Sequence, residues 1–112
     1  MKTIAPMDLY KLMQVKDNIV VIDVRNPDEF EKLHITDAIL QPLPDFKPEQ
    51  TLHYLAERDL ANSEIYVTCA SGKRAQSACL MLSAADYPHV TLIEGGTIAW
   101  YEAGLPVAGT AV

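Results

Sequence analysis

The chain alternates between short apolar runs and segments whose apolar residues recur at helical spacing. Four apolar runs predict β-strands, at residues 19–24, 38–40, 65–68 and 90–93, and residues 2–4 could add a short edge strand. The run at 19–24 consists almost entirely of valine and isoleucine, which is typical of a strand buried on both faces. The pattern therefore predicts a parallel sheet at the centre of the protein.

Five helices are predicted between and after these runs, beginning near residues 6, 27, 48, 74 and 96. The second has a clear start signal, because Asn26 can cap it, Pro27 suits its first turn and Glu29 can reach back to the cap. The third is expected to run to residue 58 and the fourth to 86–88. This alternation predicts an α/β fold, with a central parallel sheet of about five strands and helices on both faces.

Composition and charge narrow the class of protein. At 112 residues, the chain is expected to form one domain over residues 1–112, with its core at about 4–107. A net charge of −6 argues against a nucleic-acid-binding protein. The apolar runs are too short to span a membrane, and no signal-peptide core follows Met1. A reduced, cytoplasmic protein is expected, while the oligomeric state and any continuation past the apolar tail at 108–112 stay open.

The segment 66–77 holds the residues that we expect to carry the chemistry. An apolar strand ends at Cys69, a short surface loop follows, and a helix begins near Arg74. A loop before a helix directs free N–H groups into a common cavity, where the positive end of the helix dipole adds to them. Such a cavity would stabilise a thiolate and also a bound anion. The predicted site consists of Cys69 as the catalytic nucleophile and the active-site loop residues Ala70, Ser71, Gly72, Lys73 and Arg74.

Each of these residues also has a plain structural interpretation. Cys69 could be a buried structural thiol, although Gly72, which lets the backbone turn inward, favours a nucleophile. The guanidinium of Arg74 offers a planar pair of donors, so it could clamp an anion, brace the loop or pair with a surface carboxylate. Lys73 could shape the potential at the site or be solvated. Cys79 is expected to be inert core, with a resolving thiol as the alternative.

Other polar residues are expected to be structural. Arg25 follows a predicted strand, and we expect it to pair with a carboxylate such as Glu29 and thereby fix the turn. His34, His53 and His89 are scattered without ligand spacing, so no metal site is expected.

The pattern Cys-x-x-Gly-x-Arg from Cys69 to Arg74 resembles the active-site loop of the rhodanese (sulfurtransferase) family. Three further parts of the chain resemble that family in the same order: Asp23-Val24-Arg25 with Glu29-Phe30, then His34-Ile35, then Glu94-Gly95-Gly96 with Trp100 and Gly104-Leu105-Pro106-Val107. The resemblance runs from about Ile4 to Val107. The chain departs from the family pattern at Thr36-Asp37, where Pro-Gly is usual, and at Ala70, where some thiosulfate-using members carry a basic residue.

The resemblance implies a rhodanese-like fold and a sulfurtransferase that works by double displacement. Cys69 would take a sulfane sulfur from a small anionic donor such as thiosulfate, hold it as a persulfide, and pass it to a thiophilic acceptor such as cyanide, a thiol or a protein. No cofactor is expected, because one polarisable sulfur suffices for this chemistry.

Two alternatives stay open. The first is a persulfide carrier or regulatory binding module with little turnover, which the short chain and Ala70 favour. The second is a cysteine-dependent phosphatase, which also uses a cysteine and an arginine in a loop before a helix. That signature has five residues between the cysteine and the arginine, whereas this chain has four.

Overall fold

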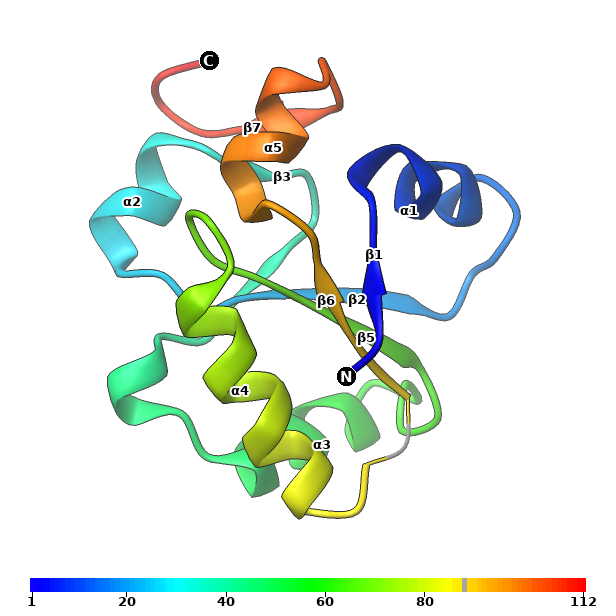
Figure 1. The fold of residues 1–112 in the computed structure, drawn as a ribbon. Helices are drawn as coiled ribbons and strands as arrows, with labels where there is room; N and C mark the ends of the chain where they lie inside the picture. The colour runs from blue at the N-terminus through cyan, green and yellow to red at the C-terminus, as the bar shows by residue number, and fades with distance from the viewer. Residues whose placement is uncertain (88) are drawn as a thin grey trace.

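The computed structural model describes residues 1–87 and 89–112 (Figure 1). Its centre is a five-stranded sheet in the order β1-β6-β5-β2-β4, and all of its neighbouring strands run parallel. The strands are β1 (Thr3–Ile4), β2 (Ile19–Asp23), β4 (Ile39–Leu40), β5 (Glu64–Thr68) and β6 (Val90–Ile93). The predicted α/β fold with a parallel sheet of about five strands is therefore confirmed.

Helices cover both faces of this sheet (Figure 1). The described residues form α1 (Pro6–Met13), α2 (Pro27–Lys32), α3 (Pro48–Ala56), α4 (Lys73–Ala84) and α5 (Gly96–Glu102), with a 3₁₀ turn at Leu43–Asp45. Successive strand residues point to opposite faces, so Val20 and Ile22 pack in a core with α3 and α4, whereas Val21 packs with α1 and α5. The side chains of the continuous apolar run at 19–24 thus contribute to two cores, one on each face of the sheet.

Two helices end earlier than the spacing of their apolar residues predicts. Helix α3 ends at Ala56 rather than at residue 58, and α4 ends at Ala84 rather than at 86–88. An aspartate in the left-handed conformation follows each of them, Asp59 with φ 57° and Asp86 with φ 64°, and this conformation cannot continue a helix. Pro88 lies outside the described residues.

A second, two-stranded sheet is not predicted by the sequence. Strand β3 (His34–Ile35) pairs antiparallel with β7 (Val107–Ala108). The tail then turns onto α2, where the N–H groups of Thr110 and Ala111 donate to the carbonyls of Glu31 and Lys32, both at 2.9 Å. The last residues of the chain are therefore hydrogen-bonded to the C-terminal end of α2.

The turn after β3 contains Thr36-Asp37, one of the two places where the chain departs from the pattern that it otherwise resembles. Asp37 adopts φ 67°, in the left-handed region where glycine is usual, and aspartate tolerates this region better than most residues.

Over the described residues, no helix is both long and apolar enough to cross a bilayer.

Candidate active site

Cys69 lies at the carboxyl end of a central strand. It directly follows β5, whose last residue pairs with the last residue of β2 (Asp23 with Thr68). Ligands of open α/β sheets bind at this edge. The Cys69 side chain is only 1% exposed and lies in the core shared with α4, whereas Ser71 and Lys73 of the same loop are exposed. The loop is thus at the surface, but its thiol points inward.

A backbone amide of the loop is directed at the thiol. The Gly72 N–H donates to Cys69 Sγ at 2.9 Å. Gly72 adopts φ 122°, a conformation that other residues rarely adopt, and α4 begins immediately afterwards at Lys73. The sulfur therefore lies beside the start of a 12-residue helix, where main-chain donors and the helix dipole favour negative charge.

The other side of the loop is held by α5. The Thr97 N–H donates to the Cys69 carbonyl at 2.8 Å, and the Ile98 N–H donates to the Ala70 carbonyl at 3.2 Å. A Cβ atom added at Gly96 would overlap both carbonyl oxygens, so only glycine permits this approach. These contacts are tertiary and leave no signal in the loop sequence, although the Gly95-Gly96 pair marks a close backbone approach.

Arg74 is engaged by a carboxylate rather than being free to bind an anion. Its Nη1 and Nη2 donate to the two oxygens of Glu29 at 2.8 and 3.1 Å. Glu29 also reaches back to the Asn26 N–H at 3.0 Å, which confirms the predicted capping contact of α2. These contacts, first of all the hydrogen bonds from Arg74, lower the pKa of Glu29 to about 2, and the pKa of Arg74 is raised by the same pair.

Arg25 pairs with a carboxylate, as predicted, but the suggested partner Glu29 is wrong, because the carboxylate is that of Asp23. The Arg25 Nη2 donates to Asp23 Oδ2 at 2.9 Å and to the Leu33 carbonyl at 2.6 Å. Both side chains are buried. Residues two apart at the end of a strand point to the same face, which is the signal that could have identified Asp23. The pair fixes the turn into α2, as predicted for Arg25, and so sets the position of Glu29.

Cys79 lies on the buried face of α4, in the same core as Cys69, and both thiols are free. Burial is the main cause that raises the pKa of Cys79 to about 11. The surroundings of Cys79 thus disfavour a thiolate.

Two of the histidines make local contacts. His34 stacks on Phe30 with ring centroids 3.8 Å apart, and its Nδ1 lies 2.7 Å from the Phe30 carbonyl. His53 Nε2 lies 2.8 Å from Glu57 Oε1 at the surface. Within residues 1–87 and 89–112, no three His, Cys, Asp or Glu side chains are grouped so as to hold a metal ion.

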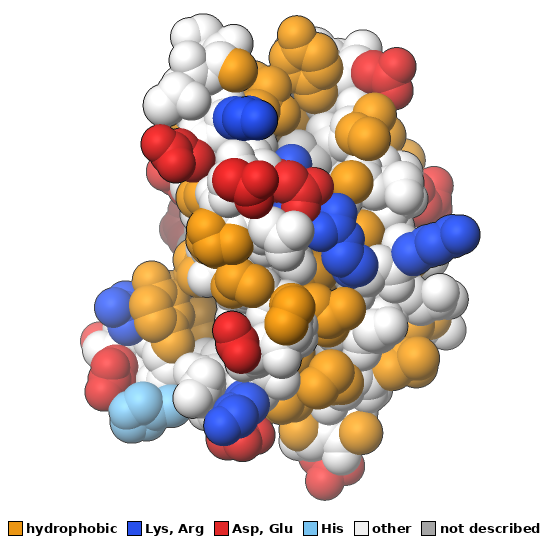
Figure 2. Space-filling view, turned by 90° about the vertical axis from the view of Figure 1, so that its left-hand side faces the viewer, with side chains coloured by type: hydrophobic (Ala, Val, Ile, Leu, Met, Phe, Trp, Pro, Cys, Tyr) orange, Lys and Arg blue, Asp and Glu red, His pale blue; other side chains and the backbone are white. Residues whose placement is uncertain are grey.

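The side of the molecule that carries α2 in Figure 1 shows mixed charge. In Figure 2, Asp and Glu side chains lie directly beside Lys and Arg side chains on this face, and no broad basic patch is visible. On this face, attraction of an anion to the loop would depend on the loop amides and on Lys73, because Arg74 is paired with Glu29.

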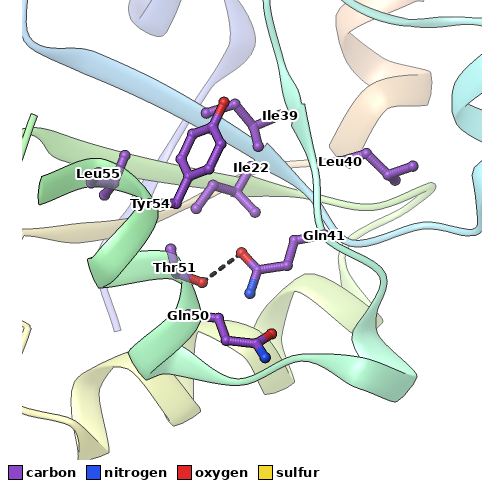
Figure 3. A pocket seen from close by; sticks show the side chains of 8 residues that line it. All are labelled: Ile22, Ile39, Leu40, Gln41, Gln50, Thr51, Tyr54 and Leu55. Atoms are coloured by element: carbon purple, nitrogen blue, oxygen red, sulfur yellow. Dashed lines mark hydrogen bonds between the residues drawn. The ribbon is translucent and has the colours of Figure 1, made fainter. Parts of the chain in front are cut away.

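A separate pocket lies between β4 and α3 (Figure 3). Its walls include Ile22, Ile39 and Leu55, and the Thr51 hydroxyl donates to Gln41 Oε1 across it. None of its lining residues belongs to the loop 69–74. This hollow is not part of the cysteine site.

The fold and the loop together define an α/β protein built around a thiol at the carboxyl end of a central strand. The chain belongs to the rhodanese-like family, because residues 5–103 match the family described as a rhodanese-like domain.

Named relatives of the chain include sulfurtransferases. An uncharacterized protein of Synechocystis is 38% identical over 108 residues, which cover 96% of this chain and 56% of that protein. A sulfurtransferase of Allochromatium vinosum is 31% identical over 91 residues, which cover 81% of this chain and 79% of that protein. The chain also spans 23% of an adenylyltransferase and sulfurtransferase of Candida albicans. It therefore corresponds to only part of some relatives.

Solved structures agree on the fold. A rhodanese-related protein from Thermoplasma volcanium superposes with a TM-score of 0.74 at 28% identity, covering 96% of this chain and 98% of that one. A thiosulfate sulfurtransferase from Pseudomonas aeruginosa gives a TM-score of 0.78 at 28% identity, covering 98% of this chain and 20% of that one. The same α/β arrangement thus occurs both alone and within a longer chain.

Proposed function

We propose that the chain is a sulfurtransferase that carries sulfane sulfur on Cys69. The observation that carries the proposal is the Gly72 N–H directed at Cys69 Sγ, at the carboxyl end of a central strand and at the start of α4. Main-chain donors and a helix N-terminus favour a thiolate, and a thiolate is the nucleophile that sulfur transfer needs. The names of the relatives support the same reaction class.

The reaction comprises two displacements. The Cys69 thiolate attacks the outer sulfur of thiosulfate, the sulfur–sulfur bond of the donor breaks, and sulfite leaves with the bonding electron pair. An acceptor nucleophile such as cyanide then attacks the outer sulfur of the persulfide, and the Cys69 thiolate leaves with the electron pair of that bond. Neither step requires an external oxidant or reductant, and the loop amides stabilise the negative charge in both.

The residues of the loop have different roles in this proposal. Ala70, Ser71 and Gly72 supply amides, and exposed Lys73 contributes positive charge at the mouth of the site. Arg74 braces the loop against α2 through Glu29. In this role, Arg74 holds the loop in position and does not need to contact the sulfur donor.

A persulfide carrier with little turnover on free thiosulfate is the second candidate. Two observations favour it, namely the 1% exposure of Cys69 and the engagement of Arg74 by Glu29. Both limit the access of a free anion to the sulfur. A sulfur-bearing partner that displaces part of the loop would meet neither obstacle.

Intact mass after incubation with thiosulfate tests the proposal. We expect a gain of one sulfur atom, lost again on addition of cyanide and absent in Cys69→Ser. Turnover in a thiosulfate–cyanide assay indicates the enzyme, whereas a stable persulfide from an organic persulfide donor without turnover indicates the carrier. If wild-type protein gains no sulfur from either donor, the proposal is wrong.

A further inference from the structure

The contacts between α5 and the loop determine where the loop amides point. The carbonyls of Cys69 and Ala70 both face α5, where they accept the N–H groups of Thr97 and Ile98. A planar trans peptide directs its N–H opposite to its carbonyl. The N–H groups of Ala70 and Ser71 must therefore point away from α5.

The core that contains Cys69 lies on the face of the sheet opposite to α5. Trp100 of α5 packs in the core on one face of the sheet, whereas Cys69 packs in the core on the other face, with α4. The next amide along, that of Gly72, donates to Cys69 Sγ. By holding two carbonyls on its own side, α5 directs the Ala70 and Ser71 N–H groups toward the side of the loop that faces the Cys69 core.

Two buried hydroxyls strengthen this hold. Thr68 Oγ1 lies 3.2 Å from the Cys69 carbonyl and 3.0 Å from Thr97 Oγ1, and both threonines are at most 1% exposed. Because a carbonyl can only accept, the Thr68 hydroxyl donates to it, and the Thr97 hydroxyl must then donate to Thr68 Oγ1. The Cys69 carbonyl thus receives one bond from the backbone of Thr97 and a second from a hydroxyl that Thr97 orients.

We propose that Thr97 is a positioning residue that acts through the Cys69 carbonyl to aim the loop amides at the Cys69 sulfur. The inference rests on the proposed function for its biological meaning, but its test uses thiol reactivity and needs no sulfur donor. If it is correct, the anion-stabilising character of the loop depends on α5, a helix that contributes no atom to the reaction.

The test compares Thr97→Val with Thr97→Ser and with Thr51→Val. Valine keeps the shape of threonine but cannot donate to Thr68, whereas serine keeps the hydroxyl. Thr51 is a matched control, because it is also buried and its hydroxyl is also hydrogen-bonded, but it lies in the pocket beside α3. Alkylation of Cys69 by iodoacetamide is followed against pH, with the modified peptide identified by mass so that Cys79 does not contribute.

We expect Thr97→Val to slow alkylation at neutral pH by about fivefold, the effect of one lost hydrogen bond. Thr97→Ser should restore the wild-type profile, and Thr51→Val should leave it unchanged. A Thr97→Val profile that matches the wild type overturns the proposal, as does slowing of the same size in Thr51→Val.

A second pair of variants tests the backbone contacts. Gly96 and Gly104 have similar positive φ values, 65° and 76°, but a Cβ at Gly96 meets the Cys69 and Ala70 carbonyls, whereas one at Gly104 meets nothing within 4 Å. Gly96→Ala should therefore slow alkylation more than Gly104→Ala at equal folded fraction. Equal rates in the two variants contradict the proposal, and if Gly96→Ala does not fold, the comparison of Thr97→Val with Thr51→Val decides.

The readout separates this inference from the proposed function. If the wild type gains no sulfur but Thr97→Val slows alkylation, the positioning role stands and sulfur transfer fails. If the wild type transfers sulfur and Thr97→Val matches it in both alkylation and transfer, sulfur transfer stands and the positioning role fails.

Discussion

The two cysteines of this chain share one core and differ in what surrounds their sulfurs. Cys69 and Cys79 are 1% and 2% exposed. Cys79 lies within α4, and burial raises the pKa of its thiol to about 11. Cys69 lies before α4 and receives the Gly72 N–H. The comparison teaches that two equally buried thiols can have different polar surroundings, and under the proposed function the thiol beside a main-chain donor at a helix start is the reactive one.

The largest effect should come from Cys69→Ser. A serine hydroxyl is not a nucleophile for sulfane sulfur without a strong base, so transfer should fall at least about 10³-fold while the folded state is kept. A thiosulfate–cyanide assay and a thermal melt measure the two quantities. Accumulation of sulfur on Cys79 in this variant would contradict the prediction that only Cys69 is reactive.

Arg74→Ala should have the next largest effect. Loss of the bidentate pair with Glu29 frees the start of α4 from α2, and we expect transfer to fall on the order of tenfold. Because Arg74 braces the loop, the loss should be similar for thiosulfate and for a neutral organic persulfide. Arg58→Ala, which removes a surface arginine just after the end of α3, is the control. A loss confined to the anionic donor would show that Arg74 leaves Glu29 to bind the donor.

Glu29→Gln should have a smaller effect, which depends on pH. The pKa of Glu29 is about 2 in the folded protein against 4.5 as its ordinary value, so on acidification the unfolded chain binds the proton first. The stabilisation by Glu29 is complete above pH 4.5 and is lost as the pH falls toward 2. Since both partners are about one-third exposed, we expect about 1 kcal/mol at neutral pH.

Urea unfolding at neutral pH and near pH 2 measures this contribution. The wild type should be more stable than Glu29→Gln at neutral pH, and the two should converge near pH 2. Glu31→Gln, which changes an exposed glutamate of the same helix, should match the wild type at both. A constant difference across this range would show that the ionised pair with Arg74 does not stabilise the fold.

Cys79→Ala should have the smallest effect. Transfer should stay at the wild-type rate, and the free energy of unfolding should fall by about 1 kcal/mol because a small cavity remains. In Cys69→Ser, alkylation of Cys79 should become appreciable only as the pH approaches 11. Loss of transfer in Cys79→Ala would revive the alternative of a resolving thiol.

The sheet could be predicted because its central strands are runs of β-branched residues, and most helices could be located from apolar spacing and proline starts. Strands β3 and β7 could not, because two residues show no periodicity and their pairing joins His34 to Ala108, far apart in sequence. The position of Cys69 at a strand end was predicted, but its 1% exposure was not.

At the site, the side-chain partners of Arg25 and Arg74 were not predicted from the sequence. Sequence shows that Glu29 and Arg74 are charged but not that they meet, since the pair depends on how α2 docks beside the loop. The hydrogen bond from the Thr97 N–H to the Cys69 carbonyl likewise joins two elements that are far apart in the sequence. Local spacing predicts the elements that carry a site, whereas side-chain partners across elements are set by packing.

Helix α2 is too short to persist unaided, since six residues make fewer than two turns and none of them is buried. Its final carbonyls accept N–H groups from Thr110 and Ala111, which lie beyond the family match that ends at residue 103. Trimming the protein to that boundary would remove these donors, loosen the helix that presents Glu29, and weaken the brace on Arg74. A version truncated at residue 103 should thus have a more mobile 69–74 loop than residues 1–112.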